Sequence, residues 1–530
     1  MHPPLGLITV AALLPRDWEV RLVDLNFDRL ADDEILRADM VFTGGLNNQA
    51  DSLLELLARC RALGCRTVVG GPFPSSHPSW VKPVPDHLVL DEAEVTLPLF
   101  LEDLERGRPL PRYRLEQKAD LSKSPVPRFE LLQLRRYGTI ELQFSRGCPF
   151  ECEFCDTGAL CGRIPRTKTP EQTLTEFQTL YDLGYRGPVY QVDDNFGANR
   201  PAARALLDKM IPWMQERGYP FLIATQTSVE LADDRPFLDS MRLAGFKRVF
   251  LGLETPSFEG LRETRKMHNL RPDLLEAVHT FVEHDLEVMG GFIVGFDSDP
   301  DDIFERQFDF ITRSEIPFAM TGILAALPNT PLWTRLEGEG RLLGTHSCDP
   351  FGPTNFVTRM DSTKLLEGYL RLLGSIFAPQ AYFDRVLALV ARLSRAGHPR
   401  LHRKAFGCFQ ILGMTVAAVV AQGLLSPYRG IWWRFLWRLV TTYPRQYLVG
   451  LVDSVLGHHL IRYTAEILQA KGEHPAGASG CRGGAPVFKS DGAAREAGES
   501  GLEEGVPTLM ADGLDVGDPT RPRVLPGGSQ

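Results

Sequence analysis

The sequence lacks an apolar run long enough to cross a bilayer, which takes about 20 residues. The longest candidate, ILGMTVAAVVAQGLL at 411–425, is short, contains Gln422 and ends at SPYRG. The sequence also lacks the basic amino-terminal region of a secretory signal, since it opens with MHPPLGLITV. These absences predict a cytoplasmic protein.

A positive net charge is also missing. The formal net charge of the 530-residue chain is −9, which argues against a nucleic-acid binder with a basic surface. The nine cysteines are odd in number and three of them lie within eight residues, whereas a secreted disulfide framework would spread them along the chain. The length alone predicts about three domains.

Residues 1–110 alternate short apolar runs with helical patterns. EVRLVDL, DMVFTGG and RTVVGG each resemble a strand that enters a polar or glycine-rich loop, and DSLLELLARCRALG has helical spacing. This βαβ rhythm predicts a parallel doubly wound sheet, which binds ligands at the carboxyl ends of its strands. Those ends carry Asp24, Thr43, Gly44, Gly45, Gly70, Gly71 and Pro72.

Four further segments differ in composition. Residues 111–138 are rich in proline and charge, which predicts a linker. Residues 139–345 hold six strand-like runs separated by helical patterns, which favours a parallel barrel or partial barrel over a second doubly wound sheet. Residues 346–470 are mostly helical in pattern. Residues 471–530 are rich in Gly, Ala, Pro, Asp and Glu, which predicts a disordered tail.

The segment SRGCPFECEFCDTG (145–158) spaces three cysteines as C-x3-C-x2-C after the first strand of the predicted barrel. Cys148, Cys152 and Cys155 therefore lie at the carboxyl face, where barrel active sites are built. Three thiolates can hold three irons of a [4Fe–4S] cluster and leave the fourth iron open for a small ligand. The alternatives are a zinc site with Cys161 as a fourth ligand, and chance clustering of thiols.

This spacing, with the aromatic Phe154 directly before Cys155, resembles the cluster motif of radical S-adenosylmethionine (SAM) enzymes. The resemblance implies that the open iron chelates SAM and that the reduced cluster cleaves SAM to a 5′-deoxyadenosyl radical. Four more stretches fit the superfamily by position: VDDNF (192–196), LGLETPS (251–257), GGFIVGFD (290–297) and ALPNTPL (326–332). Through these motifs the resemblance implies SAM contacts by Phe154, Asp194, Glu254 and Gly291.

Two residues depart from the superfamily pattern. Asp297 stands closest to the position of a glutamate, and Asn329 replaces a glycine. The matching residues also have purely structural alternatives. Glu254 would then be a surface carboxylate at a strand end, Gly291 would admit close packing, and Asp194 would cap the following helix.

The amino-terminal runs PPLGLITVAALLP, VDLN, FTGG, VVGGP and DEAE resemble the cobalamin-binding domain that precedes many radical SAM enzymes. The region from about 346 to 470 resembles the carboxyl-terminal domain of the subgroup that includes the hopanoid C-2 methylase. The implied fold class is α/β: a Rossmann-like cobalamin-binding domain, a radical SAM partial (β/α)6 barrel and a helical domain. Cobalamin would lie near Thr43, Gly44, Gly70 and Gly71. No D-x-H-x-x-G supplies a histidine as lower axial ligand.

The resemblance implies a C-methyltransferase that acts on an unactivated carbon of a small-molecule or lipid-like substrate. It also implies three cofactors, namely a [4Fe–4S] cluster, SAM and cobalamin, and an external electron donor, flavodoxin or ferredoxin. One alternative is a cobalamin-dependent radical SAM rearrangement or oxidation without methyl transfer. The other is a non-catalytic regulator that binds cobalamin or a metal.

Family members usually carry a first strand before PPLGL, and this sequence has none there. The first strand of a doubly wound sheet lies centrally, so its loss would leave two rows of backbone groups unpaired. We therefore expect either a native start several tens of residues upstream or a domain without that strand.

The stretch IWWRFLWRLV (431–440) combines three tryptophans with Arg434 and Arg438, which share a helix face at i, i+4 spacing. Such a segment suits a membrane interface and predicts a peripheral membrane contact. The alternative is a helix packed on the barrel with its arginines extended to water.

Overall fold

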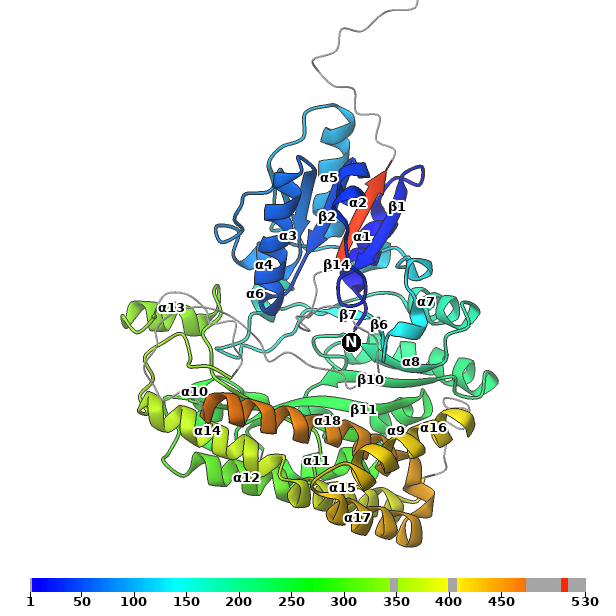
Figure 1. The fold of residues 1–530 in the computed structure, drawn as a ribbon, viewed down its shortest axis with the longest axis vertical. Helices are drawn as coiled ribbons and strands as arrows, with labels where there is room; N and C mark the ends of the chain where they lie inside the picture. The colour runs from blue at the N-terminus through cyan, green and yellow to red at the C-terminus, as the bar shows by residue number, and fades with distance from the viewer. Residues whose placement is uncertain (1, 272, 344–350, 399–407, 473–506, 513–530) are drawn as a thin grey trace, which may run out of the picture. The chain divides into compact units, whose positions relative to one another are not determined.

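The computed structural model describes residues 2–271, 273–343, 351–398, 408–472 and 507–512 (Figure 1). They form two compact units. The N-terminal unit comprises Pro4–Ala119 and Ser124–Leu132 together with residues 507–512, and the barrel unit comprises the short segments 2–3 and 120–123 and the described residues from Gln133 to 472. Within the described part of the chain, no helix has both the length and the apolar character to cross a membrane.

The N-terminal unit is built on a six-stranded sheet of order β1-β14-β2-β3-β4-β5. Its strands are β1 (Glu19–Asp24), β2 (Met40–Gly44), β3 (Arg66–Gly70), β4 (His87–Val89), β5 (Arg112–Tyr113) and β14 (Pro507–Asp512). Its helices are α1 (Leu5–Leu13), α2 (Asp32–Arg37), α3 (Ala50–Ala62), α4 (Pro72–Ser76) and α5 (Ala93–Glu105). Phe42 packs into one apolar cluster and its neighbour Val41 into another, as the alternation of a strand buried on both faces requires.

The strand between β1 and β2 comes from the far end of the chain. β14 pairs antiparallel with both neighbours, and the described residues before β1 form only α1. The predicted disordered tail is therefore wrong at 507–512, and its residues 473–506 and 513–530 lie outside the described residues. Without a strand here β1 and β2 would each leave a row of backbone groups unpaired, and a composition averaged over the whole segment hides the short run PTLMAD.

The predicted linker 111–138 also needs correction, because it begins inside the sheet. β5 pairs in parallel with β4, so residues 112–113 complete the N-terminal unit. A strand of two residues beside Pro111 is too short to show a pattern of alternation.

The barrel unit contains six parallel strands in the order β13-β12-β11-β10-β9-β6. They are β6 (Ile140–Leu142), β9 (Gly187–Gln191), β10 (Phe221–Thr227), β11 (Phe246–Glu254), β12 (Glu287–Val294) and β13 (Ala319–Ile323), and β7 (Ser145–Arg146) and β8 (Arg166–Thr167) form a separate ribbon. Spatial order follows chain order, as in a barrel and unlike a doubly wound sheet, and β6 does not pair with β13. The predicted six-stranded partial barrel is confirmed.

Helices connect and cover these strands. They are α6 (Thr157–Leu160), α7 (Pro170–Asp182), α8 (Arg200–Glu216), α9 (Arg235–Leu243), α10 (Phe258–Glu263), α11 (Leu274–Glu283), α12 (Ile303–Arg313) and α13 (Pro331–Gly338). The C-terminal helices follow: α14 (Ser362–Ile376), α15 (Pro379–Ala396), α16 (Cys408–Ala418), a π-helix (Val419–Leu424), α17 (Arg429–Thr442) and α18 (Tyr447–Gly472).

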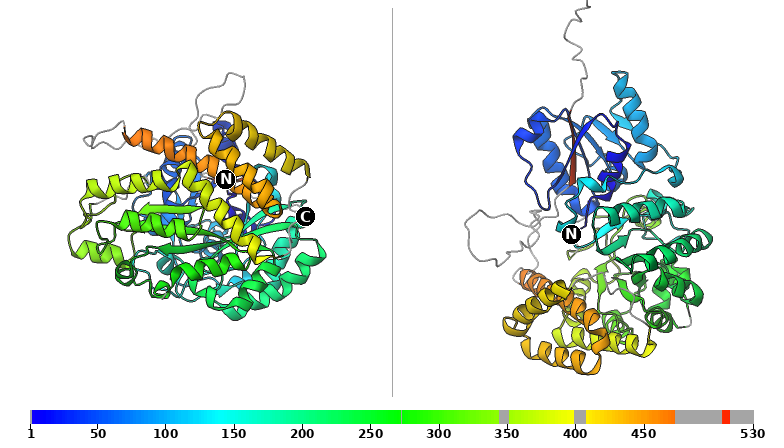
Figure 2. Two further views of the ribbon diagram at one scale, coloured as in Figure 1. Left: turned by 90° about the horizontal axis from the view of Figure 1, so that it is seen from below. Right: turned by 90° about the vertical axis from the view of Figure 1, so that its right-hand side faces the viewer.

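The C-terminal helices pack along one side of the barrel (Figure 2). The buried guanidinium group of Arg385 in α15 donates to the carbonyl oxygen of Ile316 at 2.9 Å. Arg248 of β11 forms an ion pair of 2.6 Å with Asp453 of α18. The region predicted as a separate helical domain is thus helical where described, but it forms one unit with the barrel, because buried polar groups of the two parts bond to each other across the contact.

Candidate active site

The three clustered cysteines lie in a loop that follows β7 at the carboxyl end of the barrel strands. Cys152 is buried, and Cys148 and Cys155 are half-buried. The preceding Gly147 has φ of 98°, and a Cβ there would come within 2.9 Å of the carbonyl oxygen of Gly162. The loop therefore requires glycine at this point.

The thiols are close enough to influence one another. Burial is the main cause that raises the pKa of Cys152, to about 11, and the neighbouring Cys155 and Cys148 raise it further. Iron binding at this loop would thus displace the proton of Cys152, whose thiol is otherwise held neutral.

The donor set fits a cluster better than a zinc ion. Among the described residues, no three His, Cys, Asp or Glu side chains converge closely enough to hold one metal ion. Cys161, the fourth ligand of the zinc alternative, instead hydrogen-bonds with Asp194. A [4Fe–4S] cluster needs no convergence on one point, because each thiolate binds a different iron. The three thiols present fit such a cluster.

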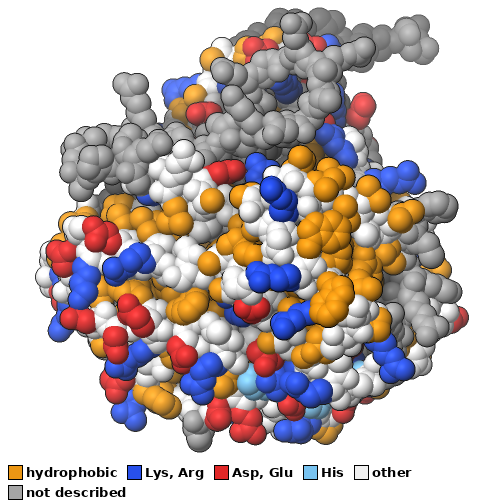
Figure 3. Space-filling model, turned by 60° about the horizontal axis from the view of Figure 1, so that its bottom comes forward, with side chains coloured by type: hydrophobic (Ala, Val, Ile, Leu, Met, Phe, Trp, Pro, Cys, Tyr) orange, Lys and Arg blue, Asp and Glu red, His pale blue; other side chains and the backbone are white. Residues whose placement is uncertain are grey.

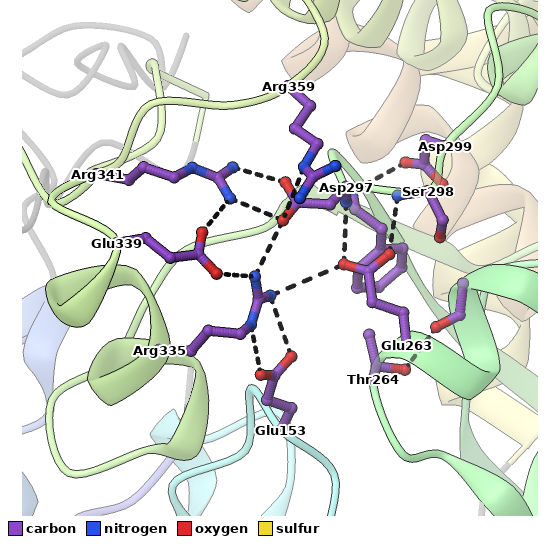
Figure 4. A network of polar contacts seen from close by, with 12 residues as sticks. Glu153, Glu263, Thr264, Asp297, Ser298, Asp299, Arg335, Glu339, Arg341 and Arg359 are labelled. Atoms are coloured by element: carbon purple, nitrogen blue, oxygen red, sulfur yellow. Dashed lines mark hydrogen bonds and ion pairs between the residues drawn. The ribbon is translucent and has the colours of Figure 1, made fainter.

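The loop is fixed to its surroundings through Glu153, which lies between Cys152 and Phe154 (Figure 4). Its backbone N–H donates to the carbonyl oxygen of Thr264 at 2.8 Å, and its carbonyl oxygen accepts from Leu332 at 3.0 Å. Its carboxylate accepts from Arg335 of α13, with Nε to Oε1 at 2.7 Å and Nη2 to Oε2 at 3.2 Å.

The same network defines the role of Asp297. Its carboxylate receives hydrogen bonds from Arg341, at 2.6 Å and 2.8 Å, and from Arg335, at 3.0 Å. These guanidinium groups hold the pKa of Asp297 below its ordinary value, although burial acts in the opposite direction. Asp297 is thus engaged in ion pairs. Asn329, which replaces the superfamily's glycine, has φ of 65°, a left-handed conformation that asparagine tolerates.

A buried lysine lies beside the cysteine loop. Lys266 donates to Glu254 Oε1 at 2.5 Å, and its Nζ lies 5.8 Å from the centre of the Phe154 ring. The charge of Glu254, and after it that of Cys152, raises the pKa of Lys266 against the effect of burial. Gly252 makes room for this pair, since a Cβ there would come within 2.5 Å of Glu254 and 2.7 Å of Lys266.

Glu254 itself is buried and has φ of 64°. The alternative reading of Glu254 as a surface carboxylate is therefore wrong. A left-handed backbone at a residue other than glycine is strained and is found mostly where function or packing enforces it.

Asp194 supports the start of the cysteine loop. Its Oδ2 accepts from the backbone N–H of Gly147 at 2.7 Å, and burial is the main cause that raises its pKa. The helix-cap alternative is wrong, because the residue that caps α8 is Asn199, whose side chain accepts from Ala202.

Gly291 in β12 lies opposite Gly252 of β11. A Cβ at Gly291 would come within 2.7 Å of the Phe250 ring, so close packing already requires glycine there. The barrel thus gathers three predicted residues around the loop, namely Phe154, Asp194 and Glu254, whereas Gly291 has a packing role of its own.

The residues predicted to contact cobalamin meet at the carboxyl ends of β2 and β3 in the N-terminal unit. Gly44 and Gly70 are paired neighbours, and a Cβ on Gly44 would come within 2.6 Å of the Gly70 carbonyl oxygen. Gly71 follows with φ of 92°, and Thr43 is buried. These glycines let the ends of β2 and β3 lie close together and place no side chain at positions 44, 70 and 71.

Sequence reasoning missed Lys266, Arg335 and the role of Glu153. Glu153 lies within the cysteine motif, but its partner is 182 residues away. Lys266 pairs with Glu254, which lies 12 residues earlier in the chain. This spacing has no recognisable sequence pattern, so the sequence does not distinguish Lys266 from an exposed lysine.

Comparison with known families identifies two regions. Residues 142–311 match the Radical SAM superfamily, and residues 330–473 match a domain of unknown function, DUF4070. The chain is 38% identical over 476 residues to an uncharacterized methyltransferase of Synechocystis sp., an alignment that covers 89% of this chain and 88% of the relative. It is 33% identical over 471 residues to the hopanoid C-2 methylase of Rhodopseudomonas palustris, with 88% of each chain covered.

The fold also resembles solved structures. The radical SAM methyltransferase TsrM of Kitasatospora setae, solved with cobalamin and a [4Fe–4S] cluster, aligns with a TM-score of 0.58 at 15% identity over 88% of this chain and 97% of its own. The cobalamin-dependent SAM radical enzyme OxsB aligns with a TM-score of 0.54 at 15% identity, over 90% of this chain and 79% of its own.

Proposed function

The chain belongs to the radical SAM superfamily, in the group that joins the radical SAM domain to DUF4070 and includes the hopanoid C-2 methylase, and from this we propose a cobalamin-dependent C-methyltransferase. It methylates an unactivated carbon atom of a small-molecule or lipid-like substrate. The observation that carries the proposal is the three-thiol loop at the carboxyl end of a six-stranded partial barrel, in a chain similar over most of its length to methyltransferases.

When bound, the [4Fe–4S] cluster, SAM and cobalamin supply the radical and methyl-transfer chemistry, while the protein positions them and excludes water. Cys148, Cys152 and Cys155 would hold the cluster. Phe154, Asp194, Glu254 and Gly291 would contact SAM, for Gly291 in addition to the close packing that already requires glycine there. Thr43, Gly44, Gly70 and Gly71 would contact cobalamin.

The residues of this chain prepare the cysteine loop for its cofactor. Lys266 places a positive charge beside Cys152, which offsets part of the increase that burial causes in the pKa of this thiol and so favours the thiolate that iron requires. Arg335 and the backbone partners of Glu153 hold the loop between two elements, so that the thiols stay in place without metal. Burial of this region limits water at the reacting centre.

The proposal also includes an electron donor, a cellular location and a membrane contact. An external one-electron donor, a flavodoxin or ferredoxin, reduces the cluster. The protein works in the cytoplasm, where a reducing environment keeps Cys60, Cys65 and the cluster thiols free of disulfides. A peripheral contact with a membrane brings the enzyme to a lipid-like substrate.

The test is anaerobic reconstitution with iron and sulfide, followed by incubation with cobalamin, a reductant, methyl-labelled SAM and a bacterial lipid extract. We expect about four irons per chain with matching sulfide, cleavage of SAM and transfer of the labelled methyl group to an extracted compound. Replacing Cys148, Cys152 and Cys155 by alanine abolishes all three. The matched control is Cys161→Ala, which removes a neighbouring thiol outside the cluster and leaves the iron content unchanged.

Two outcomes contradict the proposal. SAM cleavage with a product that gains no carbon would identify a rearrangement or oxidation instead of methyl transfer. Zinc without sulfide, together with no cleavage of SAM, would identify a metal-binding regulator.

A further inference from the structure

Helices α16 and α17 and the π-helix between them carry an apolar surface that is open to solvent. Figure 3 shows hydrophobic side chains gathered on this face with Lys and Arg side chains between them. Its large apolar side chains are between 43% and 76% exposed: Leu412, Val416, Val420, Leu424, Leu425, Trp433, Trp437 and Val440. A contiguous exposed patch of this kind marks a contact with another molecule.

Helix α17 is apolar on two faces. Trp432, Phe435 and Leu439 are buried, and the indole N–H of Trp432 donates to Ser454 Oγ of α18 at 2.9 Å. Packing on the body of the unit therefore accounts for one face only. Trp433 and Trp437 point outward and need a second explanation.

The helices that carry this face have charge of one sign. Residues 408–452 contain four Arg, no Lys and no Asp or Glu, although the whole chain has a net charge of −9. Arg429, Arg434, Arg438 and Arg445 are exposed. In the described part of the chain, none of these four guanidinium groups forms an ion pair.

We infer that this face docks on an anionic lipid surface, with the indole and aliphatic side chains at the acyl boundary and the guanidinium groups among the headgroups. Apolar side chains flanked by basic ones are the pattern of segments that lie in a membrane interface. A second copy of the chain is a poorer occupant, because a symmetric contact would bring the same arginines together with no carboxylate between them. The inference deepens the proposed membrane contact, and vesicle binding measured without SAM tests it independently of the reaction.

The experiment measures co-sedimentation of the full chain with vesicles of phosphatidylcholine alone or mixed with phosphatidylglycerol. We expect binding to the anionic vesicles that weakens as salt is raised, and quenching of tryptophan fluorescence by brominated lipid. Leu425→Ser with Trp437→Ser weakens the binding about tenfold or more. Arg434→Gln with Arg438→Gln weakens it about thirtyfold, since each basic residue contributes about 1 kcal/mol.

The matched control is Leu183→Ser with Arg313→Gln, which removes an exposed leucine at the C-cap of α7 and an exposed arginine of α12. This variant binds vesicles as the unmodified protein does. Equal binding to neutral and anionic vesicles would overturn the inference, as would binding that the surface variants leave intact. A dimer in sedimentation that Trp437→Ser dissociates would overturn it in favour of a second copy.

Discussion

Arg335 and Glu153 form a two-point ion pair, with Arg335 Nε 2.7 Å from Glu153 Oε1 and Nη2 3.2 Å from Oε2. The glutamate lies inside the cysteine motif and the arginine in a helix that follows the last barrel strand. The contact thus fixes the cysteine loop to the opposite end of the barrel sequence.

Replacing Arg335 with glutamine should loosen this loop. The Glu153 carboxylate, only 7% exposed, would lose its cation, which costs about 2 kcal/mol of unfolding free energy. We expect iron content after reconstitution and SAM cleavage to fall several-fold together. Arg359→Gln is the matched control, since Arg359 is 69% exposed and 3.6 Å from Asp297, and it should change stability by less than about 0.5 kcal/mol. Full iron loading of the Arg335 variant would show that the ion pair does not position the loop.

Lys266→Met should lower the unfolding free energy more than the double variant Lys266→Met with Glu254→Gln does. The single change leaves a buried carboxylate without its partner, at a cost of about 3–5 kcal/mol, and the second change removes that carboxylate's charge. Urea unfolding of both variants measures the difference. Because Lys266 lowers the pKa of Cys152, we also expect slower alkylation of this thiol in cluster-free protein of the single variant. Equal stability of the two variants would contradict the pairing.

The stability of the protein should decrease as the pH rises from about 4 to about 7. Burial raises the pKa of Asp299 to about 7, although the backbone N–H groups of Gly295 and Phe296 donate to it. The folded state therefore keeps a proton that the unfolded chain releases at about pH 4, so the stabilisation from this proton falls between about pH 4 and about pH 7 and is absent above that range.

Asp299→Asn keeps an oxygen acceptor for both N–H groups and removes the titration. We expect unfolding free energies at about pH 5 and about pH 8 to differ less in this variant, by on the order of 2 kcal/mol. A residual slope should remain, since burial also raises the pKa of Asp193 to about 7. An unchanged slope would show that Asp299 does not titrate in this range.

Removal of residues 507–530 should expose the centre of the N-terminal sheet. β14 pairs with β1 along its whole length and with β2, so its loss leaves two strand edges unpaired. Hydrogen exchange of the β1 and β2 amides, such as Leu22 and Phe42, should accelerate at least about tenfold. Truncation after Asp512 keeps β14 and serves as the control. Equal exchange in both truncated forms would contradict the pairing.

Local sequence pattern alone was enough to predict the six consecutive barrel strands and the location of the cysteine loop. The spacing of Cys148, Cys152 and Cys155 is a property of one loop, and six apolar runs separated by helical periods specify six parallel strands. Such signals lie within about 20 residues, so a single sequence can display them. Gly44 and Gly70 could be placed at strand ends for the same reason, because each of them ends an apolar run.

Only the tertiary structure decided the rest. It paired Arg335 with Glu153, buried Lys266 against Glu254, and joined the C-terminal helices to the barrel through Arg385 and Asp453. It also placed β14 between β1 and β2, where the sequence indicated a strand missing and a tail without structure. Each of these results depends on which groups from distant parts of the chain come into contact. A buried charge or a strand edge is satisfied by the partner that the fold brings to it. The identity of that partner produces no periodic pattern in the local sequence.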